Sequence, residues 1–115
     1  MVIHAGDCCL GVIDVAHNIE WITRVHTAAN AISSASVDNI KNDPKRHLLT
    51  KSFKAKKYVM PDIQYIALPH ATKIIMATDG FWALTATEQQ KIITQSTTQF
   101  ELEDDASFII FNSEQ

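Results

Sequence analysis

Short apolar runs divided by polar turn residues make up most of this chain, and their lengths are typical of β-strands rather than long helices. In the first part of the chain, apolar runs at residues 2–5, 8–15 and 19–23 are separated by short polar turns. This pattern predicts two or three antiparallel strands joined by those turns.

Further strands are predicted in the middle and at the end of the chain. Residues 58–68 have the pattern of an extended segment, in which Pro61 favours an edge position or a strand that begins after it. Residues 73–77 predict a buried strand, which can pair with residues 65–68 as a hairpin. Residues 106–111 predict a final buried strand.

Two helices are predicted between these strands. Alanine and isoleucine at helical spacing, among several serines, predict a weak helix over residues 26–37. Thr85 and Glu88 have the spacing of a capping box, in which each side chain satisfies the backbone amide of the other residue. A helix of about two to three turns should follow and carry Ile92 and Ile93 into the core.

The order strands, helix, strands, helix, strand predicts an α+β layered fold rather than a parallel doubly wound sheet. The phosphate-binding glycine loops of such parallel folds are absent, and three glycines could hardly build one. At 115 residues the chain has room for one core, so we expect residues 1–115 to form a single domain.

Composition and charge exclude several kinds of partner. Ten basic and thirteen acidic residues give a net charge of −3, so there is no global basic field to attract nucleic acid. Six of the ten basic residues lie in residues 45–57, where a solvated loop is favoured over a phosphate-binding patch. No apolar run is long enough to span a membrane. Cys8 and Cys9 are adjacent, which excludes a disulfide framework and leads us to expect a soluble protein of the reducing cytoplasm.

Acidic residues near strand ends are the candidate chemistry of this chain. Asp7 follows the first strand, Asp79 follows the strand at residues 73–77, and Asp104 precedes the last strand. Carboxylates that converge on one rim of a sheet need a cation to neutralise them, and an all-oxygen ligand set suits magnesium, manganese or calcium. Each acid also fits an ordinary turn, and Asp79 with its following glycine is a common hairpin signal.

The sequence around Asp79 resembles the metal-dependent protein serine/threonine phosphatases, the PPM or type 2C family. In that family an apolar strand ends in Ser-Asp-Gly-Leu/Phe-Trp-Asp, and residues 74–82 here are Ile-Ile-Met-Ala-Thr-Asp-Gly-Phe-Trp. Other segments resemble family motifs in the same order and at similar spacing: residues 6–10, 22–26, 49–53, 60–63 and 104–110. Together these segments extend the resemblance over nearly the whole chain.

The resemblance implies the C-terminal half of the family's fold, a partial αββα layered β-sandwich of mainly antiparallel strands with two helices. In the family, aspartates hold two metal ions that activate a water for attack on phosphoserine or phosphothreonine. By matched position, the resemblance implies that Asp79 and Asp104 are metal ligands and that Asp7 lies near an accessory metal. The implied cofactor is magnesium or manganese.

The chain also departs from the family pattern. It lacks the Asp-Gly-x-Gly-Gly motif, whose aspartate bridges both metals, and the arginine that holds the substrate phosphate belongs to the same absent half. Ala83 stands where the family has a further acid, Val25 replaces the aspartate before His26, and Lys54 replaces a glycine. Two or three carboxylates cannot complete a dinuclear centre within one chain.

Two functions follow from these matches and departures. The first is a PPM-type phosphatase-like domain, incomplete or inactive as an isolated chain; if active, it would be a metal-dependent serine/threonine phosphatase with a phosphoprotein substrate. The second is a non-catalytic, phosphatase-derived interaction module. Missing strands should leave open sheet edges, which favour a homodimer or a partner chain that completes the fold. An unrelated α+β domain is the third alternative.

Overall fold

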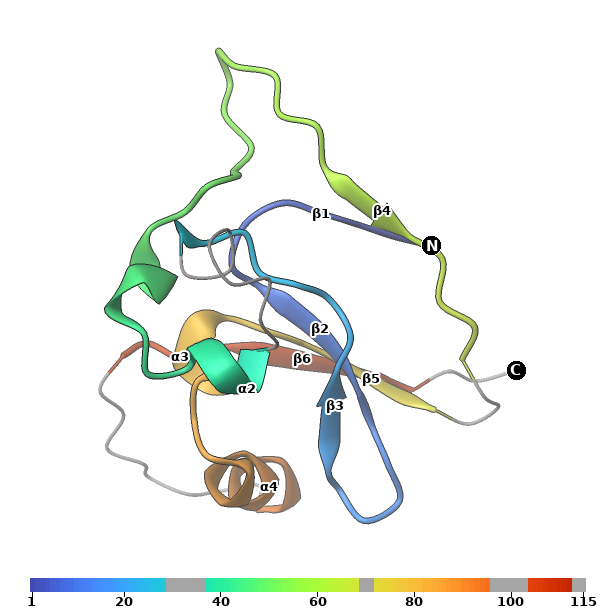
Figure 1. Ribbon diagram of the computed structural model, residues 1–115. Helices are drawn as coiled ribbons and strands as arrows, with labels where there is room; N and C mark the ends of the chain where they lie inside the picture. Colours follow the sequence, from blue (N-terminus) through green and yellow to red (C-terminus); the bar gives the residue numbers. More distant parts are fainter. Residues whose placement is uncertain (29–36, 69–71, 96–103, 113–115) are drawn as a thin grey trace.

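Strand β5 (Lys73–Ala77) lies at the centre of the fold, between β2 (Cys9–Ile13) and β6 (Phe108–Asn112). With β3 (Ile19–Trp21) these strands form a four-stranded antiparallel sheet in the order β3-β2-β5-β6 (Figure 1). A second antiparallel sheet pairs β1 (Val2–His4) with β4 (Asp62–Gln64). The computed structural model describes residues 1–28, 37–68, 72–95 and 104–112. These antiparallel sheets with their helices confirm the predicted α+β fold.

The described helices are short. They are α2 (Val37–Ile40), a 3-10 helix (Pro44–His47), α3 (Asp79–Trp82) and α4 (Ala86–Thr94). The predicted capping box is confirmed at the start of α4, because the Glu88 amide donates to the Thr85 hydroxyl and the Thr85 amide donates to the Glu88 carboxylate. The helix predicted over residues 26–37 falls largely outside the described residues. No helix in the described part of the chain is long and apolar enough to cross a membrane.

One face of the four-stranded sheet is buried against α3 and α4. In antiparallel pairs, residues directly opposite one another point to the same face, so Ile75 shares a face with its partners Gly11 and Ile110. Ile75 and Phe81 are fully buried there, and the predicted core residues Ile92 and Ile93 of α4 pack against the same cluster. Because alternate residues of β2, β5 and β6 point to this face, each of these five-residue strands contributes to the core.

The opposite face of this sheet is apolar but largely uncovered, and we call it the open face. Its six residues form two rows across β2, β5 and β6: Leu10, Met76 and Ile109 in one row, and Val12, Ile74 and Phe111 in the other. Met76, Ile109 and Phe111 remain 46%, 60% and 47% exposed. The sheet therefore has two apolar faces, and the described helices pack against one of them.

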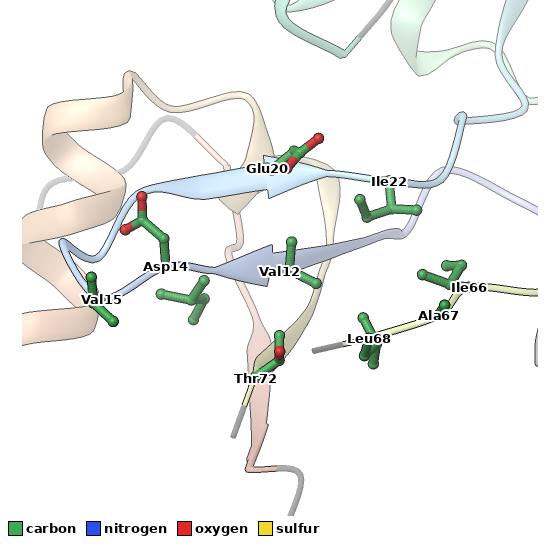
Figure 2. Close-up of a pocket in the computed structure, with 10 residues that line it drawn as sticks. Val12, Asp14, Val15, Glu20, Ile22, Ile66, Ala67, Leu68 and Thr72 are labelled. Atoms are coloured by element: carbon green, nitrogen blue, oxygen red, sulfur yellow. The ribbon is translucent and has the colours of Figure 1, made fainter. Parts of the chain in front are cut away.

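A hollow of about 530 Å³ adjoins the open face. Val12 and Ile22 line it from the β2–β3 hairpin, and Ile66 and Leu68 line it from the segment after β4 (Figure 2). The remaining residues that line it are Ile13, Asp14, Val15, Glu20, Ala67 and Thr72. The segment at residues 66–68 thus lies beside the open face at Val12.

The structure decides one pairing that the sequence had left open and contradicts another. Strand β1 does not extend the β2–β3 hairpin but pairs with β4, with Ile3 opposite Ile63. Residues 65–68 do not form a hairpin with β5, because β2 and β6 occupy both edges of that strand. Strand partners depend on the whole fold, whereas the alternation of each strand is local. This is why the strands and the β2–β3 hairpin were predicted correctly, while the partner of β1 was not.

Candidate metal centre

Asp79 follows shortly after β5 and is the first residue of α3. Figure 1 shows α3 directly after β5. The predicted strand end at this position is confirmed, but the Asp-Gly pair begins a helix rather than a hairpin turn. One oxygen of the Asp79 carboxylate accepts the Gly80 amide at 3.0 Å, and the side chain is 19% exposed. The carboxylate is therefore held by its own backbone and lies near the surface at one end of the sheet.

Asp104 is brought to the same end by the close packing of its segment against Gly80. A Cβ atom at Gly80 would collide with the backbone carbonyl of Asp105, so only glycine permits this approach. Two hydrogen bonds hold the segment in place, from the Thr78 amide to the Ser107 carbonyl and from the Ser107 amide to the Thr78 hydroxyl, both at 3.0 Å. The structure thus places Asp104 beside Asp79.

His47, which the sequence did not single out, lies at the same place. It is the last residue of the 3-10 helix, and its Nδ1 atom is 3.4 Å from an oxygen of Asp79. Ligand atoms of His47, Asp79 and Asp104 all lie within 4.8 Å of one another. Nothing local could have revealed this residue, because it lies in a polar, basic stretch without periodicity and meets Asp79 only through the fold.

The three side chains fit a divalent cation. Neighbouring and opposite donor atoms around an octahedral ion at about 2.1 Å are separated by about 3 to 4 Å. The 3.4 Å between His47 and Asp79 falls in this range, and all three ligand atoms lie within 4.8 Å of one another. Carboxylate oxygens and an imidazole nitrogen are both established ligand types for such ions. The donor set is therefore suited to one ion, with further positions left for water or for another chain.

Asp7 lies close to this group without being part of it. Its backbone carbonyl accepts the indole N–H of the buried Trp82 at 2.7 Å, which ties the turn after β1 to α3. Burial and then the nearby Asp79 carboxylate raise the pKa of Asp7 above its ordinary value. The structure therefore brings Asp79 and Asp104 together and places Asp7 within electrostatic reach of Asp79.

A second polar group forms around the buried His26 and joins the segment after β3 to the β1–β4 sheet. Its Nδ1 accepts the Gly6 amide at 3.1 Å, so the proton lies on Nε2, which is 2.8 Å from Asp62. Lys51 donates to the other Asp62 oxygen at 2.6 Å, and the ring of His4 stacks on that of His26. The Lys51 and then the His26 hydrogen bonds lower the pKa of Asp62 to about 2.

This second group is better explained as a structural network than as a metal site, although the ligand atoms of His4, His26 and Asp62 are also close together. A histidine that binds a metal almost always donates its second ring N–H to a neighbour. The second nitrogen of His26 instead accepts a backbone amide. The sequence had indicated His26 only through its resemblance to a family motif, and it had not indicated His4 at all.

Two solved phosphatases resemble this structure. The PPM Ser-Thr phosphatase MsPP from Mycobacterium smegmatis, solved in complex with cacodylate, matches 70% of this chain with a TM-score of 0.60 and 25% sequence identity. The serine/threonine phosphatase of S. agalactiae matches 84% of the chain with a TM-score of 0.63 and 20% identity, a level that shows the fold alone. The predicted resemblance to PPM serine/threonine phosphatases is therefore confirmed.

The chain spans less than half of either phosphatase, namely 36% of MsPP and 41% of the S. agalactiae protein. No protein-family model matches the sequence, and no curated protein matches it. The similarity is thus one of fold, and it extends over part of each phosphatase.

Proposed function

We propose that residues 1–115 form a phosphatase-like domain that corresponds to the C-terminal half of a PPM enzyme and supplies part of its metal centre. The observation that carries the proposal is the convergence of Asp79 and Asp104, from separate segments, within a fold that matches PPM phosphatases. Both residues occupy positions that match metal-binding aspartates of the family motifs. Asp7, nearby, is proposed to lie next to an accessory metal.

In this proposal Asp79 and Asp104 bind magnesium or manganese through their carboxylates, and the substrate is a phosphoserine or phosphothreonine of a cytoplasmic phosphoprotein. A bound ion supplies charge neutralisation of the phosphate and a water of lowered pKa. The chain's own contribution is to hold the carboxylates: Gly80 permits the close approach of their segments, and Thr78 fixes the strand after Asp104.

We also propose that the isolated chain does not turn over substrate. Its sequence contains neither the Asp-Gly-x-Gly-Gly motif that supplies the bridging aspartate nor a matched arginine for the phosphate. The described residues bring three donors together at this end of the sheet, which suits one ion rather than two. The remaining ligands would come from another polypeptide or from further sequence.

Manganese binding and phosphatase activity, measured on the same preparation, test this proposal. We expect calorimetry to detect binding of Mn²⁺ that is abolished in Asp79→Asn, whereas Glu20→Gln, an exposed acid of β3, serves as the control that still binds. We expect no hydrolysis of p-nitrophenyl phosphate above that of Asp79→Asn. Absence of Mn²⁺ binding would overturn the metal centre, and turnover that Asp79→Asn abolishes would overturn the incompleteness.

A second function, as an interaction module, is favoured by the open face. Monomeric proteins rarely leave contiguous apolar rows of this kind uncovered, and such rows mark interfaces. A second copy of this chain can cover the open face with its own, since a two-fold arrangement makes the same apolar rows meet. We propose this homodimer as the arrangement of the isolated chain, with a partner chain as the alternative occupant.

Light scattering measures the molecular mass in solution and therefore tests whether a second copy covers the open face. We expect the mass of a dimer for the wild type and of a monomer for Ile109→Lys, since a lysine at this position would place a charge within the apolar contact. Phe53→Lys, which changes an exposed aromatic outside the open face, is the matched control and should stay dimeric. A wild-type monomer would exclude the second copy as the occupant.

A further inference from the structure

We propose that His47 is a nitrogen ligand of the metal centre and that it makes this centre prefer a first-row transition-metal ion over Mg²⁺. The inference rests on the proposed function, because it concerns the centre of Asp79 and Asp104. His47 would add a nitrogen ligand to the two carboxylates. This ligand would favour transition-metal ions over Mg²⁺, whereas two carboxylates accept both kinds of ion.

The position of His47 is fixed from within its own helix. Asp43 caps the 3-10 helix through a hydrogen bond in which its carboxylate accepts the Lys45 amide at 2.8 Å. Pro44 begins the helix with a φ angle that is already suited to it. The Leu48 amide then donates to the Lys45 carbonyl, which closes the end of the helix directly after His47.

A second set of contacts holds this helix against α3. The guanidinium group of Arg46 lies 5.8 Å from the ring centroid of Trp82, as in a cation–π contact. Trp82 is fully buried and lies one helical turn after Asp79. Because Arg46 immediately precedes His47, the contact that anchors the helix also sets where the imidazole lies relative to Asp79.

Three separate segments therefore converge on one small volume. The imidazole comes from the 3-10 helix, Asp79 from the start of α3, and Asp104 from the segment that packs on Gly80. Nδ1 of His47 lies 3.4 Å from the Asp79 carboxylate, within the range of about 3 to 4 Å that separates donors around one ion. His47 is half exposed, so an ion can reach the group from solvent.

The identity of the third donor decides which ion the group prefers. Mg²⁺ favours oxygen donors and retains several of its waters, so it gains little from an imidazole. Zinc, copper, iron and nickel ions bind imidazole well, and zinc also accepts carboxylate oxygens. A centre with His47 in place should therefore bind Zn²⁺ more tightly than Mg²⁺, and this preference should become smaller when the imidazole is removed.

A plain ion pair between protonated His47 and Asp79 is the competing explanation of the same distance. The two explanations differ in the response of the ring to an added ion. If His47 is a ligand, the chemical environment of its nitrogen changes strongly when Zn²⁺ binds. If His47 only neutralises Asp79, Zn²⁺ displaces it, and replacing His47 leaves the affinity for Zn²⁺ unchanged or raises it.

Calorimetric titration of the 115-residue chain with Zn²⁺ and separately with Mg²⁺ tests the inference. We expect His47→Gln to weaken Zn²⁺ binding by about tenfold or more, since changes even beyond the direct ligands cost this much, and to leave Mg²⁺ binding within about twofold. His17→Asn is the matched control. His17 is exposed in the β2–β3 turn with a φ of 64°, a conformation that asparagine also accepts.

Nitrogen NMR of ¹⁵N-histidine-labelled protein gives the second measurement. It also separates His47 from the group of His4 and His26, because the resonances of His47 are those missing in His47→Gln. We expect one equivalent of Zn²⁺ to shift the Nδ1 resonance of His47, and Asp79→Asn to abolish that shift.

The outcomes distinguish this inference from the proposed function. If Asp79→Asn abolishes binding of both ions while His47→Gln changes neither and its resonance stays in place, the inference fails and the proposed metal centre remains. If the wild type binds neither ion, both fail. A selective loss of Zn²⁺ affinity in His47→Gln together with the shifted resonance supports both.

Discussion

At the scale of single residues, Gly80 and His4 show how much depends on close packing. Gly80 allows the segment of Asp104 and Asp105 to lie directly against α3, because there is no room for a Cβ atom beside the Asp105 carbonyl. His4 lies with both ring nitrogens buried and without hydrogen-bond partners, stacked on His26. Neither arrangement can be seen in the local sequence, and each leads to a prediction with a defined sign.

Replacing Gly80 with alanine should destabilise the protein by about 1 to 3 kcal/mol, because the added methyl group displaces the backbone of Asp105. The sign is informative, since Gly→Ala at a position with free space stabilises by about 0.4 to 1 kcal/mol through the unfolded state. Urea unfolding measures the change in free energy. A stabilised Gly80→Ala protein would show that the segment of Asp105 does not pack on α3 as described.

His4 should make the protein less stable as the pH falls. Burial, and then the neighbouring His26, lowers the pKa of His4 below its ordinary value of 6.5. The unfolded chain therefore binds a proton more readily, so stability is full above pH 6.5 and is lost as the pH falls through the lowered pKa.

His4→Phe keeps a flat ring on His26 and removes the proton-binding group. The difference in unfolding free energy between wild type and His4→Phe, measured by urea unfolding at a series of pH values, should therefore move in favour of the variant below pH 6.5. A difference that is independent of pH would show that His4 protonates equally in the folded and unfolded chain.

At the scale of elements, the start of α4 is determined by two side chains. Glu88 donates its amide to the Thr85 hydroxyl at 3.3 Å and accepts the Thr85 amide at 2.8 Å. The hydrogen bond from the Thr85 hydroxyl, and then that from its amide, lowers the pKa of Glu88. The helix in turn carries Ile92 and Ile93 onto the sheet, so this local motif supports part of the core.

Thr85→Ala should therefore lower the free energy of unfolding by about 1 kcal/mol, the usual effect of removing an N-cap side chain. Thr87→Ala, at an exposed position two residues later in α4, is the matched control and should change the stability by less than about 0.5 kcal/mol. Equal effects of the two substitutions, measured by urea unfolding, would contradict a specific role for the capping box.

At the scale of the whole molecule, the four-stranded sheet has helices on one face and the open face on the other, where Met76, Ile109 and Phe111 remain about half exposed. The phosphatases that it resembles are longer, since this chain spans 36% and 41% of them. A sheet with two apolar faces is stable when both are covered. The open face is therefore the feature through which this chain is expected to associate.

Association predicts that the melting temperature depends on protein concentration, because a dimer is stabilised by mass action. We expect the melting temperature of the wild type to rise with concentration, and that of Ile109→Lys to stay constant. Calorimetric scans over a range of concentrations measure both. A constant melting temperature for the wild type, or an equal rise for both proteins, would contradict a dimer that uses the open face.

The sequence by itself determined the features that depend on neighbouring residues. The alternation of β2, the buried run of β5 and the capping box at Thr85 are local patterns, so the strands, this helix and the α+β class were all predicted from them. The ordered motifs around Asp79 likewise predicted the phosphatase-like fold that the structural matches confirm. Asp79 and Asp104 were selected by the same motifs.

Only the tertiary structure decided which distant segments meet. The pairing of β1 with β4 and the meeting of His47 with Asp79 join residues about thirty to sixty positions apart, and such contacts form through global packing without a local signal. The start of a helix at Asp79, where a turn was expected, also depends on the fold, because Phe81 and Trp82 are buried in the core. The structure thus placed the His47 imidazole beside the carboxylates that the sequence had singled out.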